Sequence, residues 1–409
     1  MTKFAYAAIM MLLLHRCCAS VQDAYEPQPP PPVPPRLATP YFAIYKPDSV
    51  GSSLKPVEKA RDESNDPTRR KRRVKRSDSL PMPPVPRMRG FGEGDMMKEL
   101  QEMLLPNGAA VHVKNMPSLS IAYGTGTSWY SSDADTINET AVTAVLDALR
   151  SGFTHLDTAE LYGTERAVGK AISMYLKESG KSRSDIYITA KATFPDDLEA
   201  SLQGTLQRFG DAVEGYVDMY LLHSPLWDYS RDSAMPMEKV WRVMESLVHS
   251  GRVKSIGVSN FREKDLQAIL DIAPKILPSC NQIEVHLYSQ ERELRRFISR
   301  EFPDMAISAY GPLSPITGLV SRGSAMKVAE MIAQEKGSGA TAAQVLLAWG
   351  SKHGIVQVTT TAHRDRMIAA VQSQQLGLTD EDMRKLDASG EGCEFHWQHG
   401  PMAHKSYIS

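Results

Sequence analysis

The sequence lacks most features that would assign it to a specialised class of protein. It has only four cysteines in 409 residues, and two of them, Cys17 and Cys18, are adjacent, so neither a disulfide framework nor paired zinc-ligand spacing is present. Its 47 Lys and Arg balance 48 Asp and Glu, so there is no bulk positive charge to attract nucleic acid or acidic lipid. We therefore expect no nucleic-acid partner and no membrane partner.

Two further kinds of binding motif are missing. The chain has no GxGxxG turn, which argues against a doubly wound dinucleotide-binding sheet. Cys393, His396, His399 and His404 crowd the C-terminal tail, but their spacing fits no common zinc motif, so we expect no metal site.

The first residues of the chain resemble a secretory signal. Within residues 1–20, one Lys precedes an apolar run from Phe4 to Leu14, and small residues follow. This run is shorter than the roughly 20 apolar residues that a membrane-spanning helix needs. The alternative is an upstream extension from a misplaced start codon, because Met96 and Met97 stand just before the regular part of the sequence. The first interpretation predicts a secreted protein and the second a cytoplasmic one.

Residues 21–95 differ in composition from everything that follows. They are rich in proline and carry a basic run at residues 69–76. Such a segment cannot bury enough apolar surface to offset its chain entropy, so we expect disorder with polyproline II stretches. The basic run fits a processing site, a nuclear-localisation or nucleic-acid patch, or a solvated linker. The folded domain is expected at residues 96–409, including a C-terminal tail.

Beyond residue 100, short β-branched runs alternate with amphipathic stretches. The expected strands are residues 119–124, 153–157, 186–191, 217–223, 253–258, 280–285, 306–310 and 355–359. Eight strands alternating with helices predict an α/β fold, a (β/α)₈ TIM barrel. Asn107 and Gly108 ahead of the first strand favour a tight β-hairpin, which would plug the bottom of the barrel.

Ionisable residues end three of these apolar strands. Asp157 ends the second strand, Lys191 the third and His223 the fourth, and Tyr162 follows the second. The active site of such a barrel is built at the C-terminal ends of its strands, so these side chains would converge. An ammonium beside a phenol stabilises the phenolate and lowers its pKa. The set therefore predicts Tyr162 as a general acid aimed at a carbonyl oxygen, with Lys191, Asp157 and His223 in support.

The later strand ends carry groups that suit a nicotinamide nucleotide. Ser259, Asn260 and Gln282 can hydrogen-bond a carboxamide, and the ring of Tyr310 can stack on a flat heteroaromatic ring. After the eighth strand, threonines and then Arg364 and Arg366 stand near the start of a helix, which is a natural phosphate site.

Six motifs in order resemble the aldo-keto reductase family. They are GFTHLDTAELYGTERAVGKAI, IYITAK, VDMYLLHSP, KSIGVSNF, NQIEVH and ISAYGPL. The resemblance implies reversible reduction of aldehydes and ketones with NADPH, without metal or flavin. It implies that Asp157, Tyr162, Lys191 and His223 are the catalytic tetrad. The cofactor binders that it implies are Ser259, Asn260, Gln282, Tyr310, Gly311, Leu313, Thr360, Thr361 and Arg366.

The sequence departs from the family where the 2′-phosphate is held. Thr360 stands where the family has Lys, and Arg366 is kept. We expect NADPH to be the preferred hydride donor, because Arg366 can still bind a 2′-phosphate with two hydrogen bonds. NADH is the alternative donor. The threonine run resembles a fungal branch that reduces 2-keto esters and ketoamides. Steroid double-bond reductases of the family have Glu in place of His223, so carbonyl reduction is expected.

The substrate and the wider role are less constrained. Trp129, Tyr130 and Trp227 are expected to line an apolar mouth for a small-molecule carbonyl substrate, and packing residues are the alternative. A nucleotide-sensing regulatory subunit built on the same barrel is the alternative function, favoured by the long N-terminal arm. Asn138 begins a glycosylation sequon but stands where a helix should start, so we expect it to act as a cap. The oligomeric state is not indicated.

Overall fold

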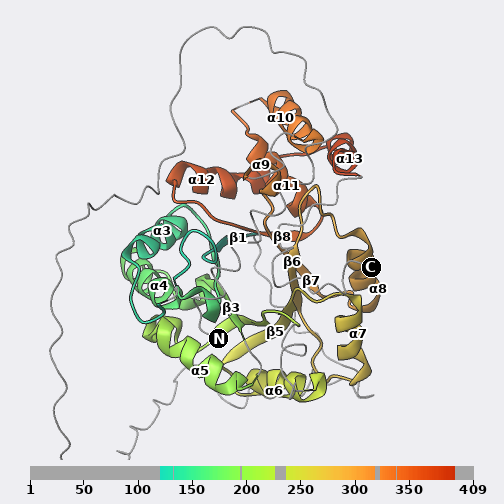
Figure 1. The fold of residues 1–409 in the computed structure, drawn as a ribbon. Coiled ribbons are helices and arrows are strands. Elements are labelled where there is room, and N and C mark those ends of the chain that lie inside the picture. Colours follow the sequence, from blue (N-terminus) through green and yellow to red (C-terminus); the bar gives the residue numbers. More distant parts are fainter. Residues whose placement is uncertain are drawn as a thin grey trace, which may run out of the picture. The chain divides into compact units, whose positions relative to one another are not determined.

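The described part of the chain is a closed barrel of eight parallel strands. A computed structural model describes residues 120–131, 133–193, 196–225, 236–317, 323–337 and 339–391. In this part the strands pair with their neighbours in chain order from β1 to β8, and β8 closes on β1 (Figure 1). The (β/α)₈ barrel is confirmed. The signal-like segment, the Pro-rich segment, the expected hairpin, Trp227 and the C-terminal tail lie outside the described residues.

The strands lie close to where the β-branched runs place them. They are β1 (Ile121–Gly124), β2 (His155–Asp157), β3 (Tyr187–Ala192), β4 (Val217–Leu222), β5 (Val253–Ser259), β6 (Cys280–Glu284), β7 (Ala306–Tyr310) and β8 (Ile355–Thr359). The last two match the expected bounds, and the others differ by one or two residues at an end. β4 ends one residue before His223, which therefore begins the following loop.

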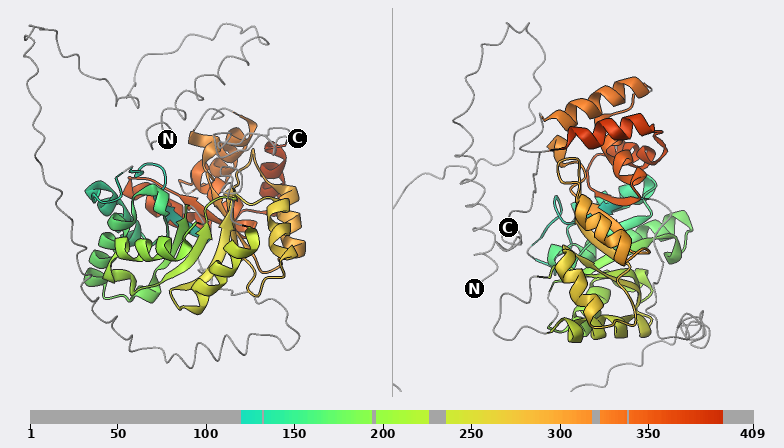
Figure 2. Two further views of the ribbon diagram at one scale, coloured as in Figure 1. Left: turned by 60° about the horizontal axis from the view of Figure 1, so that its bottom comes forward. Right: turned by 90° about the vertical axis from the view of Figure 1, so that its right-hand side faces the viewer.

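Helices surround this barrel. The α-helices are α3 (Glu139–Arg150), α4 (Glu165–Ser179), α5 (Leu198–Phe209), α6 (Met237–His249), α7 (Glu263–Asp271), α8 (Arg292–Glu301), α9 (Ser314–Thr317), α10 (Ser324–Lys336), α11 (Ala342–Lys352), α12 (Arg364–Gln372) and α13 (Asp380–Ser389). Short 3₁₀ turns are η2 (Glu160–Tyr162), η3 (Arg183–Asp185), η4 (Asp211–Val213) and η6 (Ser373–Gln375). Two further views show the helices covering the outside of the strands, with α10 packed against α11 and α13 (Figure 2).

Capping side chains set where several helices begin. The side chain of Asn138 accepts a hydrogen bond from the backbone N of Ala141 at 3.1 Å, so Asn138 caps α3 as expected. Thr341 and Thr379 begin α11 and α13 with capping boxes. Each such cap contributes about 1 kcal/mol, because it pairs a backbone N–H that the helix itself leaves unpaired.

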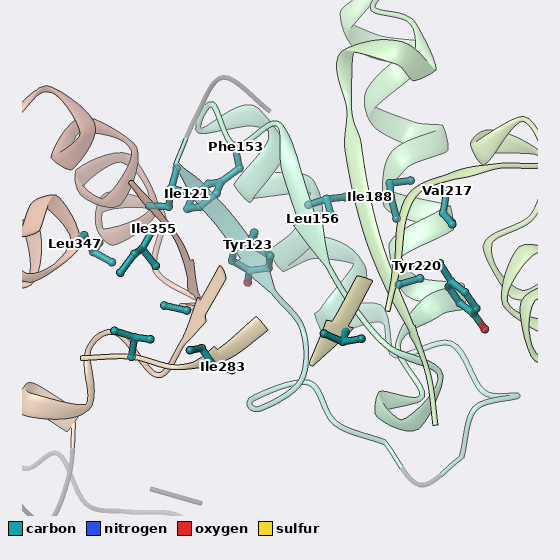
Figure 3. Close-up of a cluster of buried hydrophobic side chains, with 14 of the residues drawn as sticks. Ile121, Tyr123, Phe153, Leu156, Ile188, Val217, Tyr220, Ile283, Leu347 and Ile355 are labelled. Atoms are coloured by element: carbon teal, nitrogen blue, oxygen red, sulfur yellow. The ribbon is translucent and has the colours of Figure 1, made fainter. Parts of the chain in front are cut away.

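The main hydrophobic core lies between the barrel and its helices. Ile121, Leu156, Ile188 and Ile355 of the strands are buried there with Leu347 of α11 (Figure 3). Burying each such side chain contributes about 1.5–3 kcal/mol. Because strand side chains alternate between two faces, the neighbouring residues point into the barrel. That interior carries many of the polar side chains described below.

No helix in the described ranges is long and apolar enough to cross a membrane.

Candidate active site

A buried ion pair joins the ends of β2 and β3. Lys191 Nζ lies 2.6 Å from Asp157 Oδ1, and the lysine side chain is wholly buried. Lys191 also donates to the carbonyl oxygen of Thr158 at 3.2 Å and to the phenol oxygen of Tyr162 at 3.3 Å. Burial by itself lowers the pKa of Lys191, but the Asp157 carboxylate and Tyr162 more than offset it, so the pKa is raised. The ammonium therefore stays charged beside the phenol.

The second oxygen of Asp157 is held from the opposite side of the barrel. Gln282 Nε2 donates to Asp157 Oδ2 at 2.7 Å. β2 and β6 are four strands apart in the closed barrel, so this hydrogen bond crosses the interior. Lys191 and Gln282 together fix both oxygens of the carboxylate. Gln282 was expected among the nicotinamide binders, and its contact with Asp157 was not predicted.

Tyr162 stands at the end of the 3₁₀ turn η2 with its phenol against two buried groups. Its oxygen lies 3.3 Å from Lys191 Nζ and 3.4 Å from His223 Nε2. The tyrosine and histidine rings meet edge to face at 5.4 Å between centroids. The structure thus brings Tyr162, Lys191 and His223 together.

The phenol of Tyr162 holds its proton more firmly than expected. Burial raises its pKa above the ordinary value of 10, and this effect exceeds the lowering caused by Lys191. The expectation that Lys191 lowers the pKa of this phenol considered only the charge and not the desolvation. At neutral pH Tyr162 is therefore a protonated group that can donate.

His223 is a neutral imidazole in this environment. Burial, followed by the charge of Lys191, lowers its pKa from the ordinary value of 6.5 to about 3. Its Nε2 faces the phenol of Tyr162. Its Nδ1 is buried without a hydrogen-bond partner among the residues described.

The loop after β1 presses against Tyr162 from another side. A Cβ atom added to Gly126 would lie 2.6 Å from Cζ of Tyr162, so only glycine fits at this position with the ring where it is. The backbone N of Ser131 also donates to the carbonyl oxygen of Tyr162 at 2.9 Å. Gly126 was not predicted as a site residue, because a glycine after a strand has many ordinary explanations.

The expected carboxamide binders lie together beside His223. Asn260 adopts a left-handed backbone conformation with φ of 64°, which asparagine tolerates better than most residues. Its Nδ2 donates to the His223 carbonyl oxygen at 3.0 Å and to Ser259 Oγ at 3.1 Å. The hydroxyl of Tyr310 donates to Asn260 Oδ1 at 2.8 Å. One hydrogen-bonded set thus links three of the expected binders to the tetrad.

The remaining expected cofactor residues follow β7 and β8. Gly311 has φ of 67°, a left-handed conformation in which a residue with a side chain would be strained. Leu313 is half-buried and packs against the main core. Thr360 and Thr361, directly after β8, are half-buried, and the Thr361 carbonyl oxygen accepts from the hydroxyl of Tyr123 at 2.8 Å.

Arg366 stands exposed in the first turn of α12, and Arg364 beside it is also exposed. In the described part of the chain neither arginine forms an ion pair. Both exposed guanidinium groups lie at a helix N-terminus, where the helix dipole favours an anion.

The expected substrate residues occupy different environments. Trp129 is 7% exposed and its indole donates to the hydroxyl of Tyr123 at 3.2 Å, whereas Tyr130 is 53% exposed. Leu161, next to Tyr162, is also exposed and was not anticipated. Within the described ranges no cluster of three or more His, Cys, Asp or Glu side chains could hold a metal ion.

Comparison with known proteins agrees with the barrel fold. The model of the aldo/keto reductase family matches residues 120–391. The chain belongs to the aldo/keto reductase family. It is therefore grouped with oxidoreductases, and the matched range contains the whole barrel and every residue of the expected tetrad.

Two similar curated proteins are fungal enzymes. The NAD/NADP-dependent indole-3-acetaldehyde reductase of Schizosaccharomyces pombe is 35% identical over 273 residues, which is 66% of this chain and 90% of that protein. The NADPH-dependent alpha-keto amide reductase of Saccharomyces cerevisiae is 32% identical over 294 residues, covering 69% and 91%. The expected resemblance to a fungal branch is confirmed. Among solved structures, an aldose reductase from Giardia lamblia matches with a TM-score of 0.58 at 26% identity, covering 68% of this chain and 94% of that one.

Proposed function

We propose that this aldo/keto reductase reduces aldehydes and ketones to alcohols, with NADPH as the preferred hydride donor and Tyr162 as the general acid. One observation carries the proposal. The buried phenol oxygen of Tyr162 lies 3.3 Å from the Lys191 ammonium and 3.4 Å from His223 Nε2. This arrangement is suited to delivering a proton to an oxygen that becomes negatively charged.

Each residue of the tetrad then has a distinct part in proton transfer. Tyr162 donates its proton to the carbonyl oxygen of the substrate as that oxygen gains charge. Lys191 stabilises the phenolate left behind, and Asp157 keeps Lys191 charged and in place. Neutral His223, in the tautomer with the proton on Nε2, donates a second hydrogen bond to the same substrate oxygen. A positioned acid of this kind contributes about 10²–10⁴-fold to the rate.

The donor set beside the tetrad fits a nicotinamide nucleotide. When bound, the nucleotide supplies the hydride. Ser259, Asn260 and Gln282 offer amide and hydroxyl groups for the carboxamide, and Tyr310 offers a ring for stacking. These four side chains already hydrogen-bond to one another or to tetrad residues, so the chain holds them in place.

Arg366, with Thr360 and Thr361, favours NADPH over NADH. An exposed guanidinium without an ion-pair partner in the described part can bind a 2′-phosphate with paired hydrogen bonds. The missing family lysine weakens this preference, and the S. pombe relative is named for using both nucleotides. We therefore expect NADPH to bind more tightly and NADH to remain a working donor.

The substrate is proposed to be a small carbonyl compound with an apolar or aromatic group. Tyr130 and Leu161 are exposed on the two loops that meet at Tyr162. We propose that they line the substrate pocket together with Trp129 and Trp227. The names of the fungal relatives specify an aldehyde and an alpha-keto amide. Aldehydes, 2-keto esters and 2-keto amides are therefore the first compounds to assay.

The test is fluorescence titration of the full chain with NADPH and NADH, followed by nicotinamide absorbance decay with these carbonyls. We expect binding with turnover, and Tyr162→Phe should lose about 10²–10⁴-fold in kcat while its Kd for NADPH is unchanged. Undiminished turnover in Tyr162→Phe would remove Tyr162 as the acid. Tight nucleotide binding without any turnover would instead favour the nucleotide-sensing function.

A further inference from the structure

Three buried threonines surround the base of the loop that carries Tyr162. Thr125 follows β1, Thr158 follows β2 and Thr164 stands just before α4, and each is at most 1% exposed. Thr164 Oγ1 lies 2.9 Å from Thr125 Oγ1 and 3.0 Å from Thr158 Oγ1. Thr125 Oγ1 in turn donates to the carbonyl oxygen of Asp157 at 3.2 Å.

The contacts allow one consistent direction for the three hydroxyl protons. Since Thr125 donates to the Asp157 carbonyl, Thr164 must donate to Thr125, and Thr158 must then donate to Thr164. Each hydroxyl proton is donated once, and the last acceptor in this series of hydrogen bonds is the carbonyl oxygen of Asp157. Buried hydroxyl chains of this kind strengthen one another because each bond polarises the next.

The position of Thr164 shows that its hydroxyl is diverted from a more usual contact. It is the N-cap of α4, where a threonine oxygen normally accepts a backbone N–H of the first turn. Here Thr164 makes no side-chain cap hydrogen bond, whereas Asn138, Thr341 and Thr379 do cap their helices. The Thr164 hydroxyl therefore bonds to Thr125 and Thr158, which follow β1 and β2, and not to the backbone of α4.

We propose that the hydroxyl chain Thr158–Thr164–Thr125 is a positioning device for the general acid. This inference rests on the proposed function of Tyr162. The Thr158–Thr164 hydrogen bond closes the segment 159–163, which contains Tyr162, at its base. Thr158 also accepts Lys191 Nζ on its carbonyl oxygen at 3.2 Å. The same residue therefore holds both the loop with the phenol and the ammonium that faces it.

The test compares Thr164→Val and Thr158→Val with Thr164→Ser in the full chain. Thr164→Val breaks two of the hydroxyl contacts, and Thr158→Val removes only the first donor of the chain, so its effect should be smaller. Thr164→Ser keeps the hydroxyl and should restore the wild-type behaviour. Thr143→Val is the matched control, since the hydroxyl of Thr143 bonds only within the exposed face of α3 in the described structure.

Three measurements distinguish positioning from general stability. Thr164→Val should lower kcat by up to about 100-fold, the size of effect caused by a 1 Å misplacement, with the Kd for NADPH unchanged. The alkaline limb of its pH profile should move to higher pH, because a displaced phenol loses the pKa-lowering effect of Lys191. Amide hydrogen exchange in the 158–164 segment should be faster in Thr164→Val than in Thr164→Ser.

Wild-type kcat and wild-type exchange in Thr164→Val would overturn the proposal, as would equal losses in Thr164→Val and Thr164→Ser. If Thr164→Val does not fold, the same comparison with Thr158→Val decides. If the wild-type chain shows no turnover, the proposed reductase function fails, and the exchange rates alone still decide whether the hydroxyl chain fixes this segment.

Discussion

Replacing Gly126 by alanine tests whether catalysis depends on where the ring of Tyr162 lies. The added Cβ would sit 2.6 Å from Cζ, 2.7 Å from Cε2 and 3.0 Å from Cε1 of that ring. Carbon atoms in contact settle at about 3.5 Å, so the ring or the loop must move by about 1 Å. A shift of that size lengthens the contacts of the phenol oxygen with Lys191 and His223, which are already 3.3 and 3.4 Å.

The expected cost falls on kcat. A misplacement of about 1 Å can cost about 100-fold in rate, and forcing a methyl into packed space costs about 1–3 kcal/mol of stability. The assay is steady-state reduction of an aldehyde at saturating NADPH, together with a nucleotide titration and a thermal melt. The Kd for NADPH should be unchanged, because the three atoms nearest to the added Cβ all belong to the ring of Tyr162.

A matched control separates this effect from a general effect of alanine. At Gly377 an added Cβ would meet no atom within 4 Å, so Gly377→Ala should keep the wild-type kcat. If Gly126→Ala turned over substrate as fast as the wild type while remaining folded, the ring position would not limit the reaction, and the reasoning from this close contact would be refuted.

The other predictions concern charge. Lys191→Met leaves the Asp157 carboxylate buried without its ammonium, so we expect a loss of about 3–5 kcal/mol in urea unfolding together with loss of turnover; an unchanged unfolding midpoint would contradict this. His155 and His223 are buried with pKa values lowered to about 3, so between that pH and 6.5 the unfolded chain binds more protons. Stability should therefore fall as pH drops from 6.5 towards 3, which urea titrations at several pH values would show, and a flat profile would count against both shifts. Arg366→Ala should weaken NADPH binding by about tenfold and leave NADH binding unchanged, and an equal loss for both nucleotides would place the arginine away from the 2′-phosphate.

The barrel could be predicted from the sequence because each strand has a recognisable local sequence pattern. Runs such as residues 306–310 and 355–359 are short, apolar and bounded by polar turns, and their observed bounds agree. Asp157 and Lys191 were found because a charge at the end of a buried strand is costly unless a partner faces it. The structure adds the contact itself, in which Lys191 Nζ lies 2.6 Å from Asp157 Oδ1.

The contacts that could not be predicted are those that depend on register. Gln282 meets Asp157 only because β6 faces β2 across a closed barrel, and no local pattern specifies which strands face each other. The three threonines have the same difficulty. Thr158 and Thr164 are six residues apart, but Thr125 joins them only through the pairing of β1 with β2. Threonine is common in β-strands and at helix starts, so its presence alone indicates no such contact.

The pKa of Tyr162 shows why composition and spacing are insufficient for chemistry. A lysine beside a tyrosine predicts a lowered pKa, but the same burial that strengthens this charge interaction also penalises the phenolate. In the structure the burial dominates, and the pKa of the phenol is raised. A phenol that keeps its proton without substrate is a donor that releases it only to an oxygen gaining negative charge. The position of the ring, held by Gly126 and by the threonine hydroxyls, then matters more to this site than the resting acidity of Tyr162.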